Sequence, residues 1–151
     1  MKRNTEKEFY IRDFQEEDYP EVNEIWEMTG MGGKQRGDDL NVINKTLENG
    51  AKLLVLLESG TDKIIGTSWM THDFRRIYLH HFGIHPDYQN QGLGKFLAET
   101  SLQFAKEQNM QIKLEVHKDN TTAIHLYKKI GFNYLGDYLV YIIRNVHSIH
   151  S

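Results

Sequence analysis

The fold of this chain is decided by the stretch Gln89-Asn90-Gln91-Gly92-Leu93-Gly94-Lys95. It joins an apolar run that ends at Ile84 to an amphipathic helix pattern that begins near Leu93. A strand that passes through a glycine-rich turn into a helix presents several backbone N–H groups and the positive end of a helix dipole at one place. The stretch therefore predicts a phosphate-binding turn.

The spacing of the glycines in this turn narrows the kind of phosphate site. It does not fit a Walker loop, which needs Gly-x-x-x-x-Gly-Lys-Ser/Thr, or the G-x-G-x-x-G of a dinucleotide fold. A pyrophosphate held mainly by backbone amides stays open. The alternative is structural, because glycines at a strand-to-helix junction also serve where the backbone needs a positive φ.

Length and composition predict one globular domain. The 151 residues are enough for one core but not for two, and we expect a single domain over 1–145 followed by a polar tail over 146–151. No apolar run approaches the roughly 20 residues that span a bilayer, and the first residues lack the apolar stretch of a secretion signal. These features predict a cytoplasmic protein without a membrane segment.

Charge and cysteine content exclude several classes of chemistry. The net charge is −3 and the Lys and Arg residues are dispersed, so nucleic acid is not an expected partner. There is no cysteine, which excludes disulfides, thiolate zinc sites and a cysteine nucleophile. The eight histidines show no third ligand at a recognisable spacing, so no metal is expected either.

Hydrophobic periodicity predicts the element order β-α-α-β-β-β-α-β-α-β-β, a mixed α/β domain. The three extended runs before the glycine turn look like an antiparallel meander, and the helix after the turn makes a crossover to a parallel strand. The facing ends of the last meander strand and this parallel strand should form a ligand crevice. The expected strands are 9–14, 53–57, 64–70, 77–84, 111–117 and a closing hairpin over 132–144; the expected helices start near 18, 40, 93 and 120.

Two motifs together resemble the GCN5-related N-acetyltransferase (GNAT) family. The turn is similar to that family's Gln/Arg-x-x-Gly-x-Gly/Ala signature, with Gln89, Gly92 and Gly94 in the required places. The block 114–132 is similar to its second signature at Asn120, Ala123, Leu126, Tyr127, Gly131 and Phe132. The resemblance implies the acyl-CoA N-acyltransferase fold, a central mixed and mostly antiparallel sheet flanked by helices.

The resemblance implies that the donor is acetyl-CoA and that the reaction is acetyl transfer to a primary amine of a small molecule by direct attack. It places the pyrophosphate on the turn amides and the pantetheine along an exposed strand edge as a pseudo-strand. It also implies a homodimer. The expected cofactor-binding residues are Phe82, Gly83, Ile84, Gln89, Asn90, Gln91, Gly92, Leu93, Gly94, Lys95, Asn120 and Tyr127.

Acetyl transfer to an amine needs a base, because an alkylammonium has a pKa near 10.4 and only the neutral amine attacks. Glu115 is the expected base, since it points away from the apolar face of its strand. Its structural alternative is an ion pair with Lys113 or with a cation of a neighbouring strand. The resemblance implies that Tyr127 protonates the leaving thiolate, and core packing is its structural alternative. One of His80 and His81 should also face the crevice, as an alternative base or an acceptor-binding group, because neighbouring residues of a strand point to opposite faces.

The acceptor is less well defined by the sequence. The resemblance implies that the first two helices and the loop between them, Gly30 to Asp39, roof the acceptor site. Candidate selecting groups are Arg36, Asp38 and Asp39 in this loop, and Asp73, Arg75 and Arg76 are similar candidates. Two other functions stay open: a peptide or protein N-terminal acetyltransferase, and a catalytically silent module that binds acyl-CoA. The sequence does not decide whether the acyl group is always acetyl.

Overall fold

A computed structural model describes residues 2, 3 and 8–150, and its centre is a six-stranded sheet in the order β1-β2-β3-β4-β5-β6. Neighbouring strands are antiparallel except β5 and β6, which are parallel. The predicted meander and the predicted parallel crossover are therefore both confirmed. The strands are β1 (Lys2–Arg3), β2 (Phe9–Asp13), β3 (Lys52–Glu58), β4 (Lys63–His72), β5 (Arg76–Ile84) and β6 (Gln111–Leu114).

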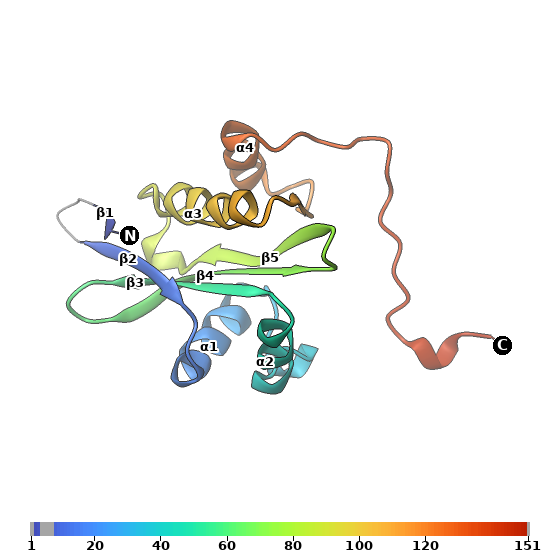
Figure 1. Cartoon of the computed structure of the whole chain (residues 1–151), viewed down its shortest axis with the longest axis horizontal. Helices are drawn as coiled ribbons and strands as arrows, with labels where there is room; N and C mark the ends of the chain where they lie inside the picture. Colours follow the sequence, from blue (N-terminus) through green and yellow to red (C-terminus); the bar gives the residue numbers. More distant parts are fainter. Residues whose placement is uncertain (1, 4–7, 151) are drawn as a thin grey trace.

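Helices cover both faces of the sheet (Figure 1). Helices α1 (Tyr19–Thr29) and α2 (Leu40–Glu48) lie on one face, and α3 (Leu93–Gln108) and α4 (Thr121–Ile130) lie on the other. Short 3₁₀ turns occur at Glu16–Asp18 (η1), Lys34–Arg36 (η2), Pro86–Tyr88 (η3) and Val146–Ser148 (η4). None of the described helices is both long and apolar enough to cross a membrane.

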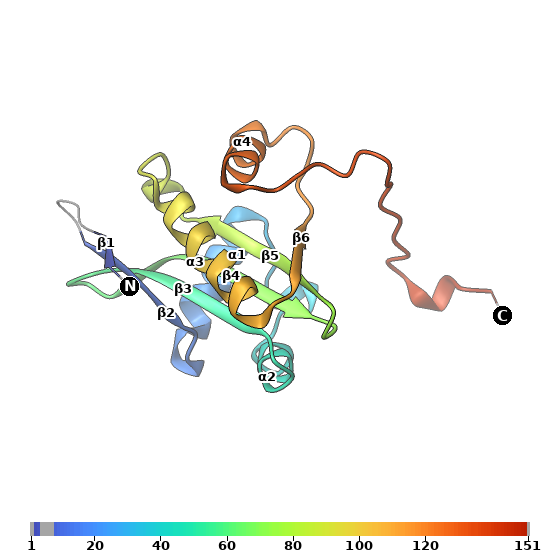
Figure 2. The same cartoon turned by 45° about the horizontal axis from the view of Figure 1, so that its top comes forward.

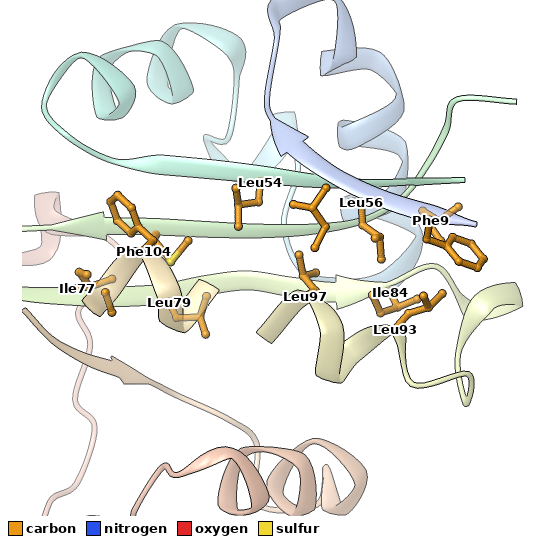
Figure 3. Close-up of a cluster of buried hydrophobic side chains, with 13 residues drawn as sticks. Phe9, Leu54, Leu56, Ile77, Leu79, Ile84, Leu93, Leu97 and Phe104 are labelled. Atoms are coloured by element: carbon orange, nitrogen blue, oxygen red, sulfur yellow. The ribbon is translucent and has the colours of Figure 1, made fainter. Parts of the chain in front are cut away.

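The continuous apolar run of β3 is explained by this layering. Leu54 and Leu56 pack in the core beneath α3, whereas Leu53, Val55 and Leu57 pack in the core beneath α1 and α2. Figure 3 shows Leu54 and Leu56 in the first of these clusters, together with side chains from α3 and β5. A strand buried on both faces needs apolar residues at consecutive positions.

The start of α1 differs from the expected capped turn. Asp18 is the residue before the helix, but its carboxylate makes no capping hydrogen bond. It accepts instead from both terminal nitrogens of Arg12, at 2.7 and 3.0 Å, and from the Gln15 amide at 2.8 Å. The bidentate ion pair ties β2 to the beginning of α1.

The C-terminal region corrects the sequence prediction. Strand β6 ends at Leu114 rather than at His117, and no described residue of 132–150 belongs to a strand, so the closing hairpin over 132–144 was wrong. After α4 the chain runs away from the body of the protein in both views (Figures 1 and 2). Strand-like composition shows that a segment fits a sheet, but it does not specify which sheet edge will pair with it.

Candidate active site

Strands β5 and β6 separate part of the way along β5. Their pairing ends at Leu79 opposite Leu114, whereas β5 continues to Ile84 and stays paired with β4 on its other edge. In the described part of the chain, the β6-facing edge of Phe82, Gly83 and Ile84 has no strand partner. The Ile84 carbonyl accepts from the Gln89 side-chain amide, so the backbone groups of Phe82 and Gly83 are the ones on this edge that are available to an extended ligand.

The glycine turn follows directly after this free edge. Asn90 and Gly92 both have left-handed backbone conformations, with φ of +65° and +76°. Gly92 is the residue before α3 and, as a glycine, makes no side-chain capping hydrogen bond to that helix. Backbone N–H groups in such alternating conformations form a concave site for an anion at a helix N-terminus.

Gln89 has a structural contact in this turn. Its side-chain amide donates to the Ile84 carbonyl at 2.9 Å, and its backbone N–H reaches the Pro86 carbonyl at 3.4 Å. Both donors are thus used to fold the turn back onto the end of β5. The structure therefore gives Gln89 a role in shaping the turn.

Tyr127 lies on α4 beside the free stretch of β5. Its ring contacts Phe82 and Phe132, with centroid distances of 5.9 and 5.7 Å. Burial raises the pKa of Tyr127 to about 12, so its hydroxyl carries a proton at neutral pH. The expected packing role and a role as proton donor are both compatible with this position.

The other expected residue of α4 caps the helix. The Asn120 side chain accepts a hydrogen bond from the Ala123 amide at 3.2 Å. Helix α4 also packs closely on α3, since a Cβ added at Gly94 would lie 3.4 Å from the Leu126 side chain. These contacts fix α4, and with it Tyr127, next to the glycine turn.

Glu115 lies on the opposite face of the sheet, one residue beyond the end of β6. Its Oε1 accepts a long hydrogen bond from the Tyr78 hydroxyl at 3.5 Å, and its side chain is exposed. Burial, and secondarily Glu115, raises the pKa of Tyr78. Within residues 8–150 no ion pair joins Glu115 to Lys113, whose ammonium lies 5.6 Å from the Tyr78 ring instead.

The two histidines of β5 correct a second prediction. Their rings do not lie on opposite faces: the two Nδ1 atoms are 2.7 Å apart, and both rings contact Trp69, at 4.7 and 5.0 Å. A bulge causes this, because His81 has a φ of +47° and the β4–β5 register shifts between Thr67 and Trp69. An extra residue in one strand breaks the alternation of side chains.

A buried network holds this bulge in place. The Thr67 hydroxyl donates to the His81 carbonyl at 2.7 Å and accepts from the Trp26 indole at 2.9 Å. His81 Nε2 lies 2.8 Å from Asp38 Oδ2, which also accepts from the Gly33 amide at 2.9 Å. The loop between α1 and α2 is thereby tied to the bulge, as no local sequence pattern had indicated.

Among the hydrogen bonds and ion pairs of the described residues, those of Asp38 alone link the candidate acceptor-selecting residues of this loop to the sheet. Arg36 donates to the Gly30 carbonyl at 3.0 Å, and Asp39 caps α2 through the Val42 amide at 2.9 Å.

Asp73 and Arg75 form an exposed ion pair at 2.9 Å. They border a shallow depression of about 320 Å³ that Arg76, Tyr78 and Lys113 also line.

Together these residues form a polar row on the α1–α2 face, which we call the acceptor row: Glu115, Tyr78, His80, His81 and Asp38. It runs from the end of β6 to the loop between α1 and α2. In the described part of the chain, no group of three histidine, aspartate or glutamate residues is arranged to hold a metal ion.

The burial of His80 predicts a pH-dependent stability. Burial, and then the neighbouring His81, lowers the pKa of His80 from 6.5 to about 4, against the opposite effect of Asp38. Between pH 4 and pH 6.5, the His80 imidazole is protonated in the unfolded chain but not in the folded chain, so stability rises with pH. We expect the free energy of unfolding to increase by about 3 kcal/mol from pH 4 to 6.5 through this group.

Denaturant unfolding of the wild type and of His80→Asn across this range would measure the effect. In His80→Asn, the free energy of unfolding should rise much less between pH 4 and 6.5 than it does in the wild type. His125→Asn, at an exposed position of α4, should keep the pH dependence of the wild type. Equal slopes in the wild type and His80→Asn would contradict the assignment.

The sequence pattern of the Acetyltransferase (GNAT) family matches residues 5–132. The chain belongs to this family. Members of the GNAT family transfer an acyl group from acetyl-CoA, so the chain is an acetyl-CoA-dependent acyltransferase.

Individual relatives agree with this family. An acetyltransferase of Yersinia pestis (strain Pestoides F) is 25% identical over 123 residues, which are 81% of this chain and 86% of that protein. A GNAT acetyltransferase of Staphylococcus aureus Mu50 shares the fold with a TM-score of 0.70 at 22% identity, over 87% of this chain and 88% of that one. A ribosomal-protein-alanine N-acetyltransferase of Brucella melitensis shares it with a TM-score of 0.68 at 20% identity, over 91% and 99%.

Proposed function

We propose that this GNAT acetyltransferase acetylates a primary amine of a small molecule by direct attack on acetyl-CoA. The observation that carries the proposal is the free edge of β5 between the glycine turn on one side and the acceptor row on the other. A donor bound along Phe82–Ile84 would present its thioester between the two faces of the sheet. The amine and the leaving thiol would then approach from opposite sides.

For the donor, we assign the pyrophosphate to the amides of Asn90–Lys95 and the pantetheine to the edge of Phe82, Gly83 and Ile84. The left-handed residues of the turn and the N-terminus of α3 support this assignment. Gln89 and Asn120 would contribute mainly by shaping the site, because each already makes an internal hydrogen bond.

For the chemistry, Glu115 is proposed as the base and Tyr127 as the acid. The amine nitrogen attacks the thioester carbonyl carbon, a C–N bond forms, and Glu115 takes the released proton, directly or through a water molecule. The C–S bond then breaks, and the Tyr127 hydroxyl gives its proton to the thiolate. The neutral state of Tyr127 at pH 7 suits this role, because only a protonated hydroxyl can donate.

Two features of the acceptor row favour a small cationic acceptor. Glu115 and Asp38 both bring carboxylates to the row, and anionic groups attract an ammonium ion before it loses its proton. The Asp38–His81 contact also ties the roofing loop down onto β5. A loop tied to the sheet by this contact is less free to move aside for an extended peptide than an untethered loop would be.

A substrate panel tests this proposal. Thiol release from acetyl-CoA would be followed with monoamines, diamines, amino sugars, amino acids and short peptides with free N-termini. We expect turnover with small amines and little with peptides. Turnover confined to peptides would overturn the proposed substrate class, and calorimetric binding of acetyl-CoA without turnover of any acceptor would overturn the proposed reaction.

A further inference from the structure

A depression in the surface continues the acceptor row beyond Tyr78. It has a volume of about 320 Å³ and is lined mainly by the β4–β5 hairpin and by Lys113 of β6. Ile77 and Leu79 of β5 are buried in the core beneath α3. Arg76 and Tyr78 alternate with them along the strand and therefore point to the opposite face. Lys113 pairs with Tyr78 across the two strands, so the depression and the acceptor row share one face of the sheet.

One of the cations in this depression is neutralised. The Arg75 guanidinium is paired with Asp73, whose carboxylate also accepts from the backbone amides of Arg75 and Arg76, at 2.9 and 3.0 Å. The two amides, and after them the guanidinium, hold the pKa of Asp73 well below its usual range. Asp73 therefore keeps its negative charge, which cancels the charge of Arg75.

The other two cations, Arg76 and Lys113, have no such partner. In the described part of the chain, neither side chain forms an ion pair with a carboxylate, and the Lys113 ammonium lies 5.6 Å from the centre of the Tyr78 ring. Both residues are exposed and can reach a ligand in the depression. Guanidinium and ammonium groups have donors only, and they bind carboxylate and phosphate oxygens through charge-assisted hydrogen bonds.

His72 also lines the depression but adds no charge. Its Nδ1 accepts from the Phe74 amide at 3.0 Å, so only Nε2 carries a proton, and Nε2 lies 3.0 Å from the Gly50 carbonyl. The lining thus has an excess of positive charge that comes from Arg76 and Lys113.

The opposite charge lies on the other side of Tyr78. The Tyr78 hydroxyl donates to Glu115, which belongs to the acceptor row. Arg76 lies two residues from Tyr78 along β5, a distance of about 7 Å in an extended strand. A carboxylate and two cations at this spacing are complementary to a molecule that carries an ammonium group at one end and an anion at the other.

We propose that the depression binds an anionic group of the acceptor, a carboxylate or a phosphate, while the amine of the same molecule lies beside Glu115. The inference rests on the proposed acetylation of a small amine and narrows its substrate to zwitterions. Arg76 and Lys113 are then specificity-determining residues. They hold the anionic end of the acceptor and so keep its amine at the site of attack.

Matched acceptors test this subsite. Straight-chain ω-amino carboxylates and ω-aminoalkyl phosphates would be compared with ω-amino amides of the same length, which keep the amine and lose the negative charge. We expect kcat/KM for the best anionic acceptor to be about tenfold or more above that for its amide. The advantage should need several bonds between amine and anion, because the two ends bind about 7 Å apart. Equal kcat/KM values for all three series would overturn the anionic subsite and leave the proposed acetylation standing.

A double variant, Arg76→Met with Lys113→Met, assigns the preference to these residues. The ratio of kcat/KM for the anionic acceptor to that for its amide should fall to about one, because methionine keeps an unbranched side chain and removes the charge. A purely structural defect would slow both acceptors and leave the ratio unchanged, which would overturn the proposal. The control is Lys106→Met, which removes an exposed cation from α3 on the other face of the sheet and should keep the wild-type ratio.

Binding measurements make the test independent of turnover. Calorimetric titration of the coenzyme A-saturated protein with the ω-amino carboxylates should show binding that is about tenfold weaker in the double variant than in the wild type. This difference without acetylation of any amine would support the anionic subsite and refute the proposed reaction. Equal affinities in the wild type and the double variant would overturn the subsite whatever the turnover.

Discussion

Replacing Glu115 with glutamine should lower kcat/KM about 100-fold or more for the best amine of the substrate panel. A positioned general base contributes roughly 10²- to 10⁴-fold to a rate, and an amide cannot take up the proton. Glutamine has the same shape, and its carbonyl can still accept from the Tyr78 hydroxyl, so the local contact is kept. Steady-state kinetics with saturating acetyl-CoA would measure the loss.

The matched control for this change is Glu107→Gln. Glu107 is an exposed glutamate on α3 whose carboxylate accepts from the Gln103 amide at 3.4 Å, away from the acceptor row. This variant should keep the wild-type rate. Unchanged turnover in Glu115→Gln, together with a large loss in His80→Asn or His81→Asn, would move the role of base to the bulge of β5.

The architecture could be predicted from local sequence patterns, because helical spacing and strand-like alternation of apolar residues occupy different segments of this chain. The apolar positions of 93–108 recur at helical spacing, whereas those of 111–114 alternate, and the glycine turn between 77–84 and 93–108 marks a crossover. A helical crossover between strands of one sheet makes the strands parallel, so the parallel arrangement of β5 and β6 was predicted correctly. The position of the free edge beside the turn was predictable for the same reason.

The acceptor row was only partly predictable, because a strand bulge is not encoded by alternation. A regular strand sends His80 and His81 to opposite faces, and the register shift that unites them depends on long-range contacts. Those contacts join Thr67 on β4, Trp26 on α1 and Asp38 in the loop to His81. From the sequence, Asp38, Arg36 and Asp39 were equal candidates in the loop. The folded loop distinguishes Asp38, because its carboxylate lies within hydrogen-bond distance of His81.

The closing hairpin failed for a different physical reason. The run 138–143 has the composition of a strand, but a strand is stable only where a paired edge and apolar faces receive it. The predicted hairpin over 132–144 required an edge of this chain's own sheet to receive the segment. The segment instead leaves the body of the protein after the turn at Leu135.

Replacing Gly92 with valine should weaken acetyl-CoA binding at least tenfold. Gly92 holds a φ of +76° at the start of α3, a conformation that costs an L-residue about 1–2 kcal/mol and a β-branched residue more. Relief of that strain would rotate the peptide groups of Asn90–Leu93 and turn their N–H groups away from the anion. Calorimetric titration with acetyl-CoA, and with coenzyme A as the acyl-free comparison, would measure the loss.

Gly60→Val separates this effect from backbone strain in general. Gly60 also has a left-handed backbone, with a φ of +91°, but it lies in the exposed turn between β3 and β4 and a side chain there would meet open space. Both variants should lose stability, whereas only Gly92→Val should lose affinity, because only its peptide groups face the donor. An equal loss of affinity in both would mean that global destabilisation, and not the geometry of the turn, accounts for the weaker binding. Unchanged affinity in Gly92→Val would contradict the assignment of the pyrophosphate to this turn.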